Sequence, residues 1–454
     1  VVRSNHMTLI GIDIGSSSVK CALLRGGKVA GQIVHAKYPS HIDGPRVEID
    51  PTVILKAIAK ATREIGPAAK KVDAIALSVL SPGWVAMDKD GAALTPIVTH
   101  QDRRSVEVAQ ELEKRVGPGR YLQIAGTRPF PGGISSTTWA WYLKHEPARL
   151  KKADLVGHLN TFLHRQLTGS RVVDTANASF MGVYSTCDFS GWSDELCDAV
   201  GARQSQLPQV FDADRIGGKL TRSAATRLGL TPGTPMTVGV VDGSAAMLAT
   251  GAAVGQLLNV CGSTDVLALC TDRFSPHPHL LTRALGIGRL WLSVSTIAAA
   301  GSAINWAKEQ FFPDHDWPKF QKLVTALARQ GAKAKGKSKQ DRAPENPAGK
   351  VHFDPYLAGD RMSIEQKQAA FAGLTLATTR QQMLAAMLES LAAASAARVH
   401  LLNDIGTPIR RDVVITGGAG KLTSVFHRDW PGKWSFRQEE EATLRGLSRL
   451  EPRE

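Results

Sequence analysis

Two short loops of glycine and hydroxyl residues, far apart in the chain, most constrain its fold. The first reads Gly-Ile-Asp-Ile-Gly-Ser-Ser-Ser over residues 11–18, and the second reads Gly-Ser-Thr-Asp over residues 262–265. Apolar runs with the composition of strands, Thr8–Ile12 and Leu257–Cys261, precede them. The backbone N–H groups and hydroxyls of such loops can surround phosphate oxygens. The repetition predicts two similar halves, each with a phosphate-type loop after a strand.

The first loop differs from the usual nucleotide-binding turns. Residues 19–24 after it are again mostly apolar, so it is predicted to join two strands of a hairpin, whereas a Rossmann or Walker loop leads into a helix. Asp13 stands between apolar neighbours, and a buried carboxylate needs a cation or hydrogen-bond donors. Asp13 is therefore a candidate Mg²⁺ ligand. A turn in which Asp13 caps local N–H groups stays open as the alternative.

A single acidic residue, Asp242, precedes the second loop. It follows the apolar run Val238–Val241 and comes before Gly243 and Ser244, at a strand end, where loop residues of α/β proteins carry chemistry. Beside a sugar hydroxyl, its carboxylate could accept the proton released in phosphoryl transfer. The alternative is an aspartate at the N-cap of a helix. Together with the two loops, Asp242 predicts a kinase built from two halves.

A third glycine-rich turn lies near the C-terminus, where residues 417–421 read Gly-Gly-Ala-Gly-Lys. A Walker loop would require a glycine at position 415 and a hydroxyl residue at position 422, where the chain has Ile415 and Leu422. Glycines after a strand would still let a flat adenine approach the backbone. An ordinary strand-to-helix turn is the alternative.

Composition places limits on the class of protein. The chain has 454 residues, of which 43% are hydrophobic, and this is enough for two or three globular domains. No stretch of about 18 to 20 uninterrupted apolar residues appears, and the N-terminus lacks the pattern of a signal peptide. The five cysteines have no paired metal-ligand spacing, and their odd number fits reduced thiols. We therefore expect a cytoplasmic protein without a membrane partner.

The formal charge of +14 raises the question of nucleic-acid binding. The densest basic run, Lys333–Lys339, lies in a polar stretch with glycine and proline, and no aromatic residues interleave with it. A solvated loop is therefore expected there, without a nucleic-acid partner. The positive field would instead attract anionic ATP.

Strand-like runs alternate with helical patterns, which predicts an α/β protein with mixed or parallel sheets. Strands are expected at Leu9–Ile14, Ala74–Ser78, Met236–Val241, Leu257–Leu269 and Val413–Thr416, and helices at Val53–Ile65, Ser105–Val116, Thr137–Leu143 and Arg380–Leu402. The main boundary is expected near residues 243–255, which divides the chain into domains of residues 7–244 and 245–454.

The order of these motifs resembles that of the FGGY carbohydrate kinases, within the actin-like, sugar-kinase and heat-shock ATPase superfamily. Beyond the two loops and Asp242, the similar segments are Pro96–Arg104, Leu167–Gly169, Asp174–Ser179, Gly255–Gln256, Phe371–Leu374, Glu389 and Gly417–Ala419. They cover nearly the whole chain, in a layout most similar to that of the xylulokinase-like members.

The resemblance implies ATP-dependent phosphorylation of a ketose or polyol, in a cleft between two ribonuclease-H-like domains that close on binding. Asp242 would be the general base, and Asp13 would help to hold Mg²⁺ through water. The implied phosphate-binding residues are Gly15, Ser16, Ser17, Ser18, Lys20, Gly262, Ser263 and Thr264, and those on the adenosine side are Gly301, Gly417, Gly418 and Ala419. The implied sugar-side residues are Ser81, Pro82, His100, Gln101, Asp102 and Arg103.

The sugar side departs from the family pattern. Ser81-Pro82-Gly83 stands where ketose kinases usually have Met-His-Gly, and His100 replaces a usual tryptophan. Asp102 and Arg103 could also simply pair with each other at a loop. A non-catalytic sugar- or nucleotide-binding relative is therefore the alternative function. An actin-like assembly protein would explain neither Leu167–Gly169 nor Asp174–Ser179, and homodimer formation is left open.

Overall fold

The computed structural model describes residues 7–335, 351–418 and 423–454. Its contacts group the chain into two units, which are described separately: unit 1 comprises residues 1–256, 270–293 and 441–454, and unit 2 comprises residues 257–269 and 294–440. The predicted limits 7–244 and 245–454 follow the linear sequence and stay a prediction. Ala419 and the basic residues 336–339 lie outside the described residues.

The main sheet of unit 1 has the order β12-β13-β6-β1-β2-β3, and the short strand β14 also pairs with β6. Its strands are β1 (Thr8–Ile14), β2 (Ser18–Arg25), β3 (Lys28–Lys37), β6 (Ala74–Val79), β12 (Ile216–Lys219), β13 (Pro235–Thr237) and β14 (Val240–Val241). Strand β1 is antiparallel to β2 and parallel to β6. The predicted hairpin around the first loop is therefore confirmed.

Burial explains why the central strands read as continuous apolar runs. Every residue of β6 and all but the first of β1 are buried, which is typical of strands covered on both faces. The run Leu257–Leu269, predicted as one strand, forms two strands, Leu257–Cys261 and Asp265–Thr271, on either side of the second loop. The run Met236–Val241 was also predicted as a single strand. It is two, because Gly239, with a φ of +86°, interrupts it.

A second sheet of unit 1 has the order β4-β5-β8-β7-β9. Its strands are β4 (His41–Asp43), β5 (Arg46–Ile49), β8 (Ile97–Thr99), β7 (Gly83–Met87) and β9 (Leu155–His158). The remaining strands of unit 1 are the pair β10 (Val172–Asp174) and β11 (Gln209–Phe211), and β17 (Leu281–Ala284). Trp84 and Trp139 are fully buried in an apolar cluster beside this sheet, and Trp141 is nearly so. Packing is thus the role that these tryptophans have here.

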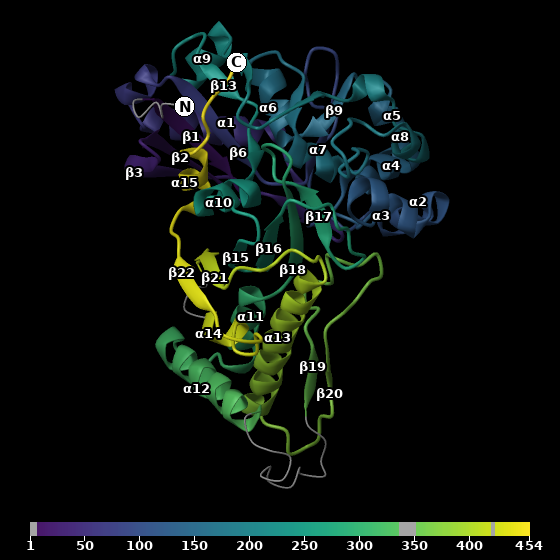
Figure 1. The fold of residues 1–454 in the computed structure, drawn as a ribbon, viewed down its shortest axis with the longest axis vertical. Coiled ribbons are helices and arrows are strands. Elements are labelled where there is room, and N and C mark those ends of the chain that lie inside the picture. Colours follow the sequence, from purple (N-terminus) through teal and green to yellow (C-terminus); the bar gives the residue numbers. More distant parts are fainter. Residues whose placement is uncertain (1–6, 336–350, 419–422) are drawn as a thin grey trace. The chain divides into compact units, whose positions relative to one another are not determined.

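The helices of unit 1 connect and flank these sheets (Figure 1). They are α1 (Pro51–Glu64), α2 (Val106–Val116), α3 (Pro118–Ala125), α4 (Ser135–His145), α5 (Pro147–Leu150), α6 (Leu159–Leu167), α7 (Thr175–Met181), α8 (Asp194–Val200), α9 (Arg222–Leu228), α10 (Asp242–Thr250) and α15 (Ala442–Leu447). Short 3-10 turns cover Pro67–Lys71 and Gln204–Gln206. Helix α15 packs on α10 and β1, and adding a Cβ at Gly446 would bring it 1.7 Å from the backbone oxygen of Ala245. Glycine is therefore required where α15 crosses α10.

The main sheet of unit 2 contains β18, β16, β15, β21 and β22 in that order. The strands and helices of unit 2 are β15 (Leu257–Cys261), β16 (Asp265–Thr271), β18 (Trp291–Ile297), β19 (His352–Asp354), β20 (Ala370–Ala372), β21 (Asp412–Thr416), β22 (Ser435–Gln438), α11 (Gly301–Phe311), α12 (Trp317–Lys335), α13 (Arg380–Asn403) and α14 (Thr423–Phe426), of which β19 and β20 form a separate pair. The long helix α13 begins with a capping box between Thr379 and Gln382. Figure 1 shows the hairpin of β19 and β20 beside α13, and the two are in contact.

The two units repeat one strand order. The first unit has five strands in question, β1, β2, β3, β6 and β14, and the second has their counterparts, β15, β16, β18, β21 and β22. When each set is numbered 1 to 5 along the chain, its strands lie side by side in the order 3-2-1-4-5. In each unit, the first strand forms an antiparallel hairpin with the second and is parallel to the fourth. This confirms the predicted α/β architecture of two ribonuclease-H-like halves. No helix among the described residues is long and apolar enough to cross a membrane.

Candidate active site

The carboxylate of Asp13 lies at the end of β1, directly beside Ser78 of β6. The two residues are partners in the parallel pair, and Ser78 Oγ donates a hydrogen bond of 2.5 Å to Asp13 Oδ1. Burial raises the pKa of Asp13 to about 7, opposed by this hydrogen bond and further raised by the charge of Asp242. A buried carboxyl of this kind is stabilised in its charged form by a nearby cation. Ser78 was not identified from the sequence.

Asp242 is the first residue of α10 and lies near Asp13 at the same edge of the main sheet. Val79, the last residue of β6, pairs with Ile14 of β1 on one side and with Val241 of β14 on the other. The three parallel strands therefore end together, and Asp13 and Asp242 interact through their charges. Val241 occupies the N-cap of α10, and Asp242 Oδ1 accepts a 2.6 Å hydrogen bond from its neighbour's backbone N–H, that of Gly243. Helix N-capping does not account for Asp242.

The first loop forms the tip of the β1–β2 hairpin. The N–H of Gly15 donates to the carbonyl of Ser18 at 3.0 Å, and the side chains of Ser16 and Ser17 between them are exposed. Lys20 follows on β2, opposite Asp13. The tip therefore presents backbone and hydroxyl groups close to the Asp13 edge.

Lys20 forms an ion pair of 2.7 Å with Glu441, and both side chains are about one-third exposed. Glu441 has a φ of +48° and precedes α15. No local signal in the sequence connects residues 20 and 441, since only the packing of α15 on the first hairpin places them together.

The second loop, between β15 and β16, packs against the start of α11. The Gly262 N–H donates to the Thr264 carbonyl at 2.8 Å, and the Ser263 carbonyl accepts from the Ala300 N–H at 2.9 Å. A Cβ at Gly301 would lie 2.4 Å from the Gly262 oxygen, so glycine is needed for this approach. The structure thus brings Gly262, Ser263, Thr264 and Gly301 together.

The glycine turn after β21 lies against the same strand end. Gly417 has a φ of +100°, and a Cβ there would lie 2.3 Å from the oxygen of Cys261. Gly418 is exposed, and a Cβ there would meet no atom of the described residues within 4 Å. The two residues therefore accompany the second loop, while Ala419, predicted with them, lies outside the described residues.

A buried polar network supports the second loop from behind, and the sequence did not reveal it. Arg398 of α13 donates to the carboxylate of Asp265 and, at 3.0 Å, to its carbonyl oxygen. Asn259 donates to the same carboxylate at 2.5 Å. Breaking a buried ion pair leaves an uncompensated charge, so this network fixes the backbone immediately after Thr264.

The predicted sugar-side segments emerge together from the second sheet. Gly83 at the start of β7 pairs with Thr99 at the end of β8, so Ser81-Pro82 before β7 and residues 100–103 after β8 lie at one end of the pair. The Ser81-Pro82 peptide is cis. The N–H of Leu80 donates a hydrogen bond of 2.7 Å to the carbonyl oxygen of Ile14. The Ser81-Pro82 segment therefore continues directly from the sheet edge that carries Asp13.

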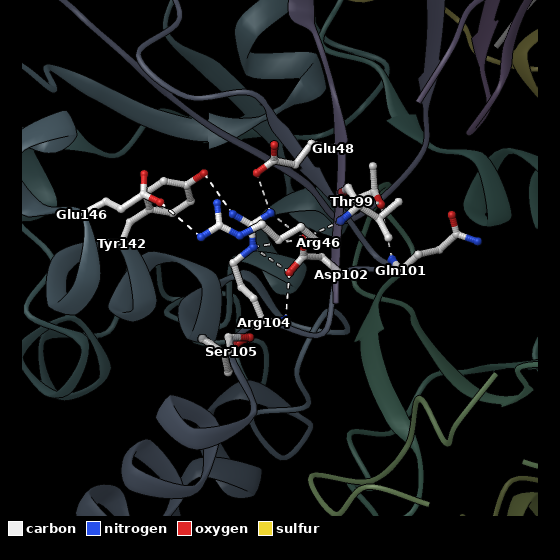
Figure 2. A network of polar contacts seen from close by, with 11 residues as sticks. Arg46, Glu48, Thr99, Gln101, Asp102, Arg104, Ser105, Tyr142 and Glu146 are labelled. Atoms are coloured by element: carbon white, nitrogen blue, oxygen red, sulfur yellow. Dashed lines mark hydrogen bonds and ion pairs between the residues drawn. The ribbon is translucent and has the colours of Figure 1, made fainter. Parts of the chain in front are cut away.

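Asp102 is a buried structural acceptor as well as a predicted sugar-side residue (Figure 2). Its Oδ2 accepts from the Val47 N–H at 2.8 Å and from Arg104 Nη2 at 2.7 Å, and its Oδ1 accepts from the Arg104 N–H at 3.0 Å. The alternative of an Asp102–Arg103 pair is not seen, because Arg104 is the partner. Both carboxylate oxygens are therefore engaged.

Arg104 links this segment to a wider network (Figure 2). Its Nη2 is 2.5 Å from Glu48 Oε1, and its Cζ lies 5.1 Å from the centre of the Trp141 ring. Arg46 lies over the same ring at 5.3 Å. Such cation–π contacts with a buried ring add to the ion pairs. Arg104 was not predicted, although it ends the Pro96–Arg104 segment.

The other sugar-side residues lie around this anchor. Gln101 is exposed, His100 is half-buried, and Arg103 donates a hydrogen bond to the Pro131 carbonyl. The loop that contains Gly132 lies close to this segment. Gly132 has a φ of +71°, and a Cβ there would collide with the carbonyl oxygens of Asp102 and His100, so glycine is needed for the approach. His100, Gln101 and Arg103 are thus held on a segment with a fixed backbone.

The residues around Asp13 fit a loosely held Mg²⁺ ion. Among the described residues, no three His, Cys, Asp or Glu side chains are grouped to hold a metal. Mg²⁺ usually keeps several waters and takes one or two carboxylates together with substrate phosphates. One buried carboxylate beside an exposed glycine-hydroxyl loop matches that pattern.

Two models of protein families match the chain. The description "FGGY family of carbohydrate kinases, N-terminal domain" matches residues 8–249, and "FGGY family of carbohydrate kinases, C-terminal domain" matches residues 257–425. Together they cover most of both units.

Known proteins resemble the chain over most of its length. The xylulose kinase of Escherichia coli (strain K12) is 25% identical over 90% of this chain and 82% of its own length. The gluconokinase of Bacillus subtilis (strain 168) is 23% identical over 84% of this chain and 74% of its own. The crystal structure of xylulose kinase from Rhodospirillum rubrum superposes with a TM-score of 0.82, at 23% identity, covering 98% of this chain and 88% of that one.

Proposed function

The chain belongs to the FGGY family of carbohydrate kinases, and on that basis we propose that it transfers the γ-phosphate of ATP to a hydroxyl of a xylulose-like ketose or polyol. The observation that carries the proposal is the pair of carboxylates, Asp13 and Asp242, at one edge of the main sheet of unit 1. Asp13 would hold the Mg²⁺ ion of the nucleotide, and Asp242 would accept the proton of the sugar hydroxyl.

Asp242 acts as the general base in this proposal. As the sugar oxygen forms its bond to the γ-phosphorus, the bond from that phosphorus to the bridging oxygen of ADP breaks, and the hydroxyl proton passes to the Asp242 carboxylate. Its half-buried position at the start of α10 supports this role, because the carboxylate is held by the helix yet is open to a substrate.

The nucleotide is assigned to the glycine-hydroxyl loops. Residues 15–18 and Lys20 are proposed to contact the phosphates from unit 1, and Gly262, Ser263 and Thr264 from unit 2. Gly301, Gly417, Gly418 and Ala419 are proposed for the adenosine side. The close packing at Gly301 and Gly417 supports this assignment, since it leaves no side chain where the backbone must be approached.

Asp13 is proposed to hold Mg²⁺, with Ser78 fixing its carboxylate. The ion neutralises charge on the transferring phosphate when bound. This chain contributes a carboxyl whose pKa is raised chiefly by burial and further by the charge of Asp242, so a bound cation would favour its charged form.

The sugar is assigned to Ser81, Pro82, His100, Gln101 and Arg103, on the two segments that emerge beside each other from β7 and β8. Asp102 is proposed to act in sugar binding by shaping this segment, because its oxygens already accept bonds from Val47 and Arg104. The imidazole, amide and guanidinium groups can donate to sugar hydroxyls.

We propose further that the enzyme acts in a reducing cytoplasm on a free small molecule. The five cysteines are free, and four of them are buried, which supports a thiol-preserving compartment.

The test is ADP release by the purified protein with MgATP across ketoses, aldoses, aldonates and polyols, D-xylulose included. Sugar-dependent ADP release should appear with a xylulose-like substrate and fall by about 10²–10⁴-fold in Asp242→Asn, which cannot accept the proton. An exposed residue of β4 provides the matched control Asp43→Asn, which should keep wild-type rates. ATP binding without turnover on any acceptor would support the diverged binding protein instead.

A further inference from the structure

Arg283 of β17 is a buried arginine placed against the first turn of α10. The residue is only 5% exposed, and its Nη1 donates a hydrogen bond of 2.5 Å to Ser244 Oγ. A Cβ on Gly243 would lie 3.2 Å from its Nη2. The guanidinium thus lies beside the two residues that directly follow Asp242. Nothing in the sequence marked Arg283 as part of the site.

This position is unfavourable for a cation unless anions compensate it. The N-terminal end of a helix carries partial positive charge, which repels a guanidinium, and burial of an ion costs several kcal/mol. Burial accordingly lowers the pKa of Arg283 to about 10, against the opposing charges of Asp242 and Asp174. The ring of Phe180, 5.3 Å from Cζ, adds a cation–π contact.

Of these two carboxylates, Asp174 is already committed to other donors. It forms the N-cap of α7: Oδ2 accepts from the N–H groups of Ala176 and Asn177, and Oδ1 accepts from the Asn160 and Asn177 side chains at 3.0 and 2.5 Å. Four donors therefore hold Asp174 in place. Asp242 directly precedes Gly243 and Ser244, beside which the guanidinium lies, and of the two carboxylates it has the larger effect on the pKa of Arg283.

We propose that Arg283 is a positioning residue that holds the Asp242 carboxylate charged and aimed for proton acceptance. It acts through Asp242 without touching the sugar, with Ser244 fixing the guanidinium and Gly243 leaving it room. This inference rests on the proposed role of Asp242 as base. A misplaced base loses rate because proton transfer requires hydrogen-bond geometry.

The first experiment measures coupling in the absence of substrates. Denaturant unfolding is compared for wild type, Arg283→Met, Asp242→Asn and the double variant. If the two residues interact, Arg283→Met should cost less in the Asp242→Asn background, with a coupling of about tenfold in the unfolding constant. Arg289→Met is the matched control, since Arg289 lies over Phe189 and donates to the Asp188 carbonyl; its effect should add to that of Asp242→Asn. Additive effects for Arg283 as well would overturn the proposal.

The second experiment separates positioning from simple structural support. On the substrate found in the panel, Arg283→Met should lower kcat by about 10²-fold while the KM values for sugar and ATP stay near wild type, and Arg283→Lys should recover part of the loss because it restores the charge. Adding Arg283→Met to Asp242→Asn should cause no further loss of kcat. A raised sugar KM with unchanged kcat would make Arg283 a sugar ligand and refute the positioning role.

The two experiments fail in different ways. If no acceptor is phosphorylated by the wild-type protein, the proposed kinase function fails, yet the unfolding cycle still decides whether Arg283 and Asp242 are coupled. If the wild type is active and the cycle is additive, only the role of Arg283 is lost. Should Arg283→Met not fold, the cycle is run with Arg283→Gln, whose amide can still donate to Ser244 but carries no charge, and a coupling of zero in that cycle contradicts the proposal equally.

Discussion

Ser78 and Asp13 are register partners in the parallel pair β1–β6, and the serine hydroxyl donates a 2.5 Å hydrogen bond to the aspartate carboxylate. This bond lowers the pKa of a carboxyl that burial has raised. It therefore favours the charged form, which is the form that binds Mg²⁺. A single hydroxyl contributes to both the charge and the orientation of the candidate ligand.

We predict that Ser78→Ala weakens activation by Mg²⁺. Without the donor, the pKa of Asp13 rises further and its orientation is lost, and both effects disfavour metal binding. Because a hydrogen bond to a charged group contributes about 1.5–3 kcal/mol, the Mg²⁺ concentration for half-maximal activity should rise about tenfold or more. Ser105→Ala is the control, since Ser105 is a buried hydroxyl bonded to Thr137 in the same unit. An unchanged Mg²⁺ requirement in Ser78→Ala would exclude Asp13 as the ligand.

The halves of the fold could be predicted because their signals are local. Apolar runs on either side of a glycine-hydroxyl loop identify a hairpin, and these appear at both Gly15 and Gly262. The long helix α13 was predicted within a residue of its observed end. Strand pairs far apart in the chain, such as β15 with β21, had no such signal, since register depends on packing.

The candidate site was predicted only in part, for the same reason. Asp13 and Asp242 carry short motifs, but their supports do not. Ser78, Arg283 and Glu441 come from other elements and approach only through tertiary packing. Asp102 shows the opposite case: its motif identified the segment correctly, while its partner, Arg104, could be assigned only from the geometry.

Gly301→Ala should disrupt the second loop. The added Cβ would lie 2.4 Å from the Gly262 backbone oxygen, and a backbone atom cannot move aside as a flexible side chain can. We expect a loss of about 1–3 kcal/mol of stability and a higher KM for ATP, measured by denaturant unfolding and by kinetics. Gly119→Ala, in helix α3 with no atom within 4 Å of its Cβ position, should leave both unchanged or add slight stability. Wild-type ATP affinity in Gly301→Ala would argue against this loop as the nucleotide site.

Arg104→Met should destabilise unit 1 and weaken sugar binding. It leaves the carboxylates of Asp102 and Glu48 without their cation, and removing one partner of a buried pair costs about 3–5 kcal/mol. Arg46→Met is the comparison, because Arg46 lies over the same Trp141 ring but its side chain is 40% exposed and its ion pair, with Glu146, is longer at 3.6 Å. Its cost should be about 1 kcal/mol or less. Equal losses in the two variants would mean that the ion pairs with Arg104 contribute little.

Acid should destabilise the protein through its buried histidines. His164 is fully buried, with Nε2 3.0 Å from the Thr237 carbonyl, and burial lowers its pKa to about 4. Because this pKa lies below the ordinary value of about 6.5, the unfolded chain takes up the proton first. The contribution of neutral His164 to the free energy of unfolding is therefore fully present above about pH 6.5 and is lost as the pH falls toward 4. At about 1.4 kcal/mol for each unit between the two pKa values, the loss is about 3 kcal/mol.

His164→Gln isolates this contribution, because a glutamine amide can still donate to the Thr237 carbonyl but does not titrate. The difference in unfolding free energy between about pH 7.5 and about pH 4.5 should be smaller in His164→Gln than in wild type. Part of the acid loss should remain, since burial also lowers the pKa of His158 to about 3. The exposed His41 of β4 supplies the control His41→Gln, which should follow the wild-type profile. Identical pH profiles for wild type and His164→Gln would show that protonation of His164 does not drive acid unfolding.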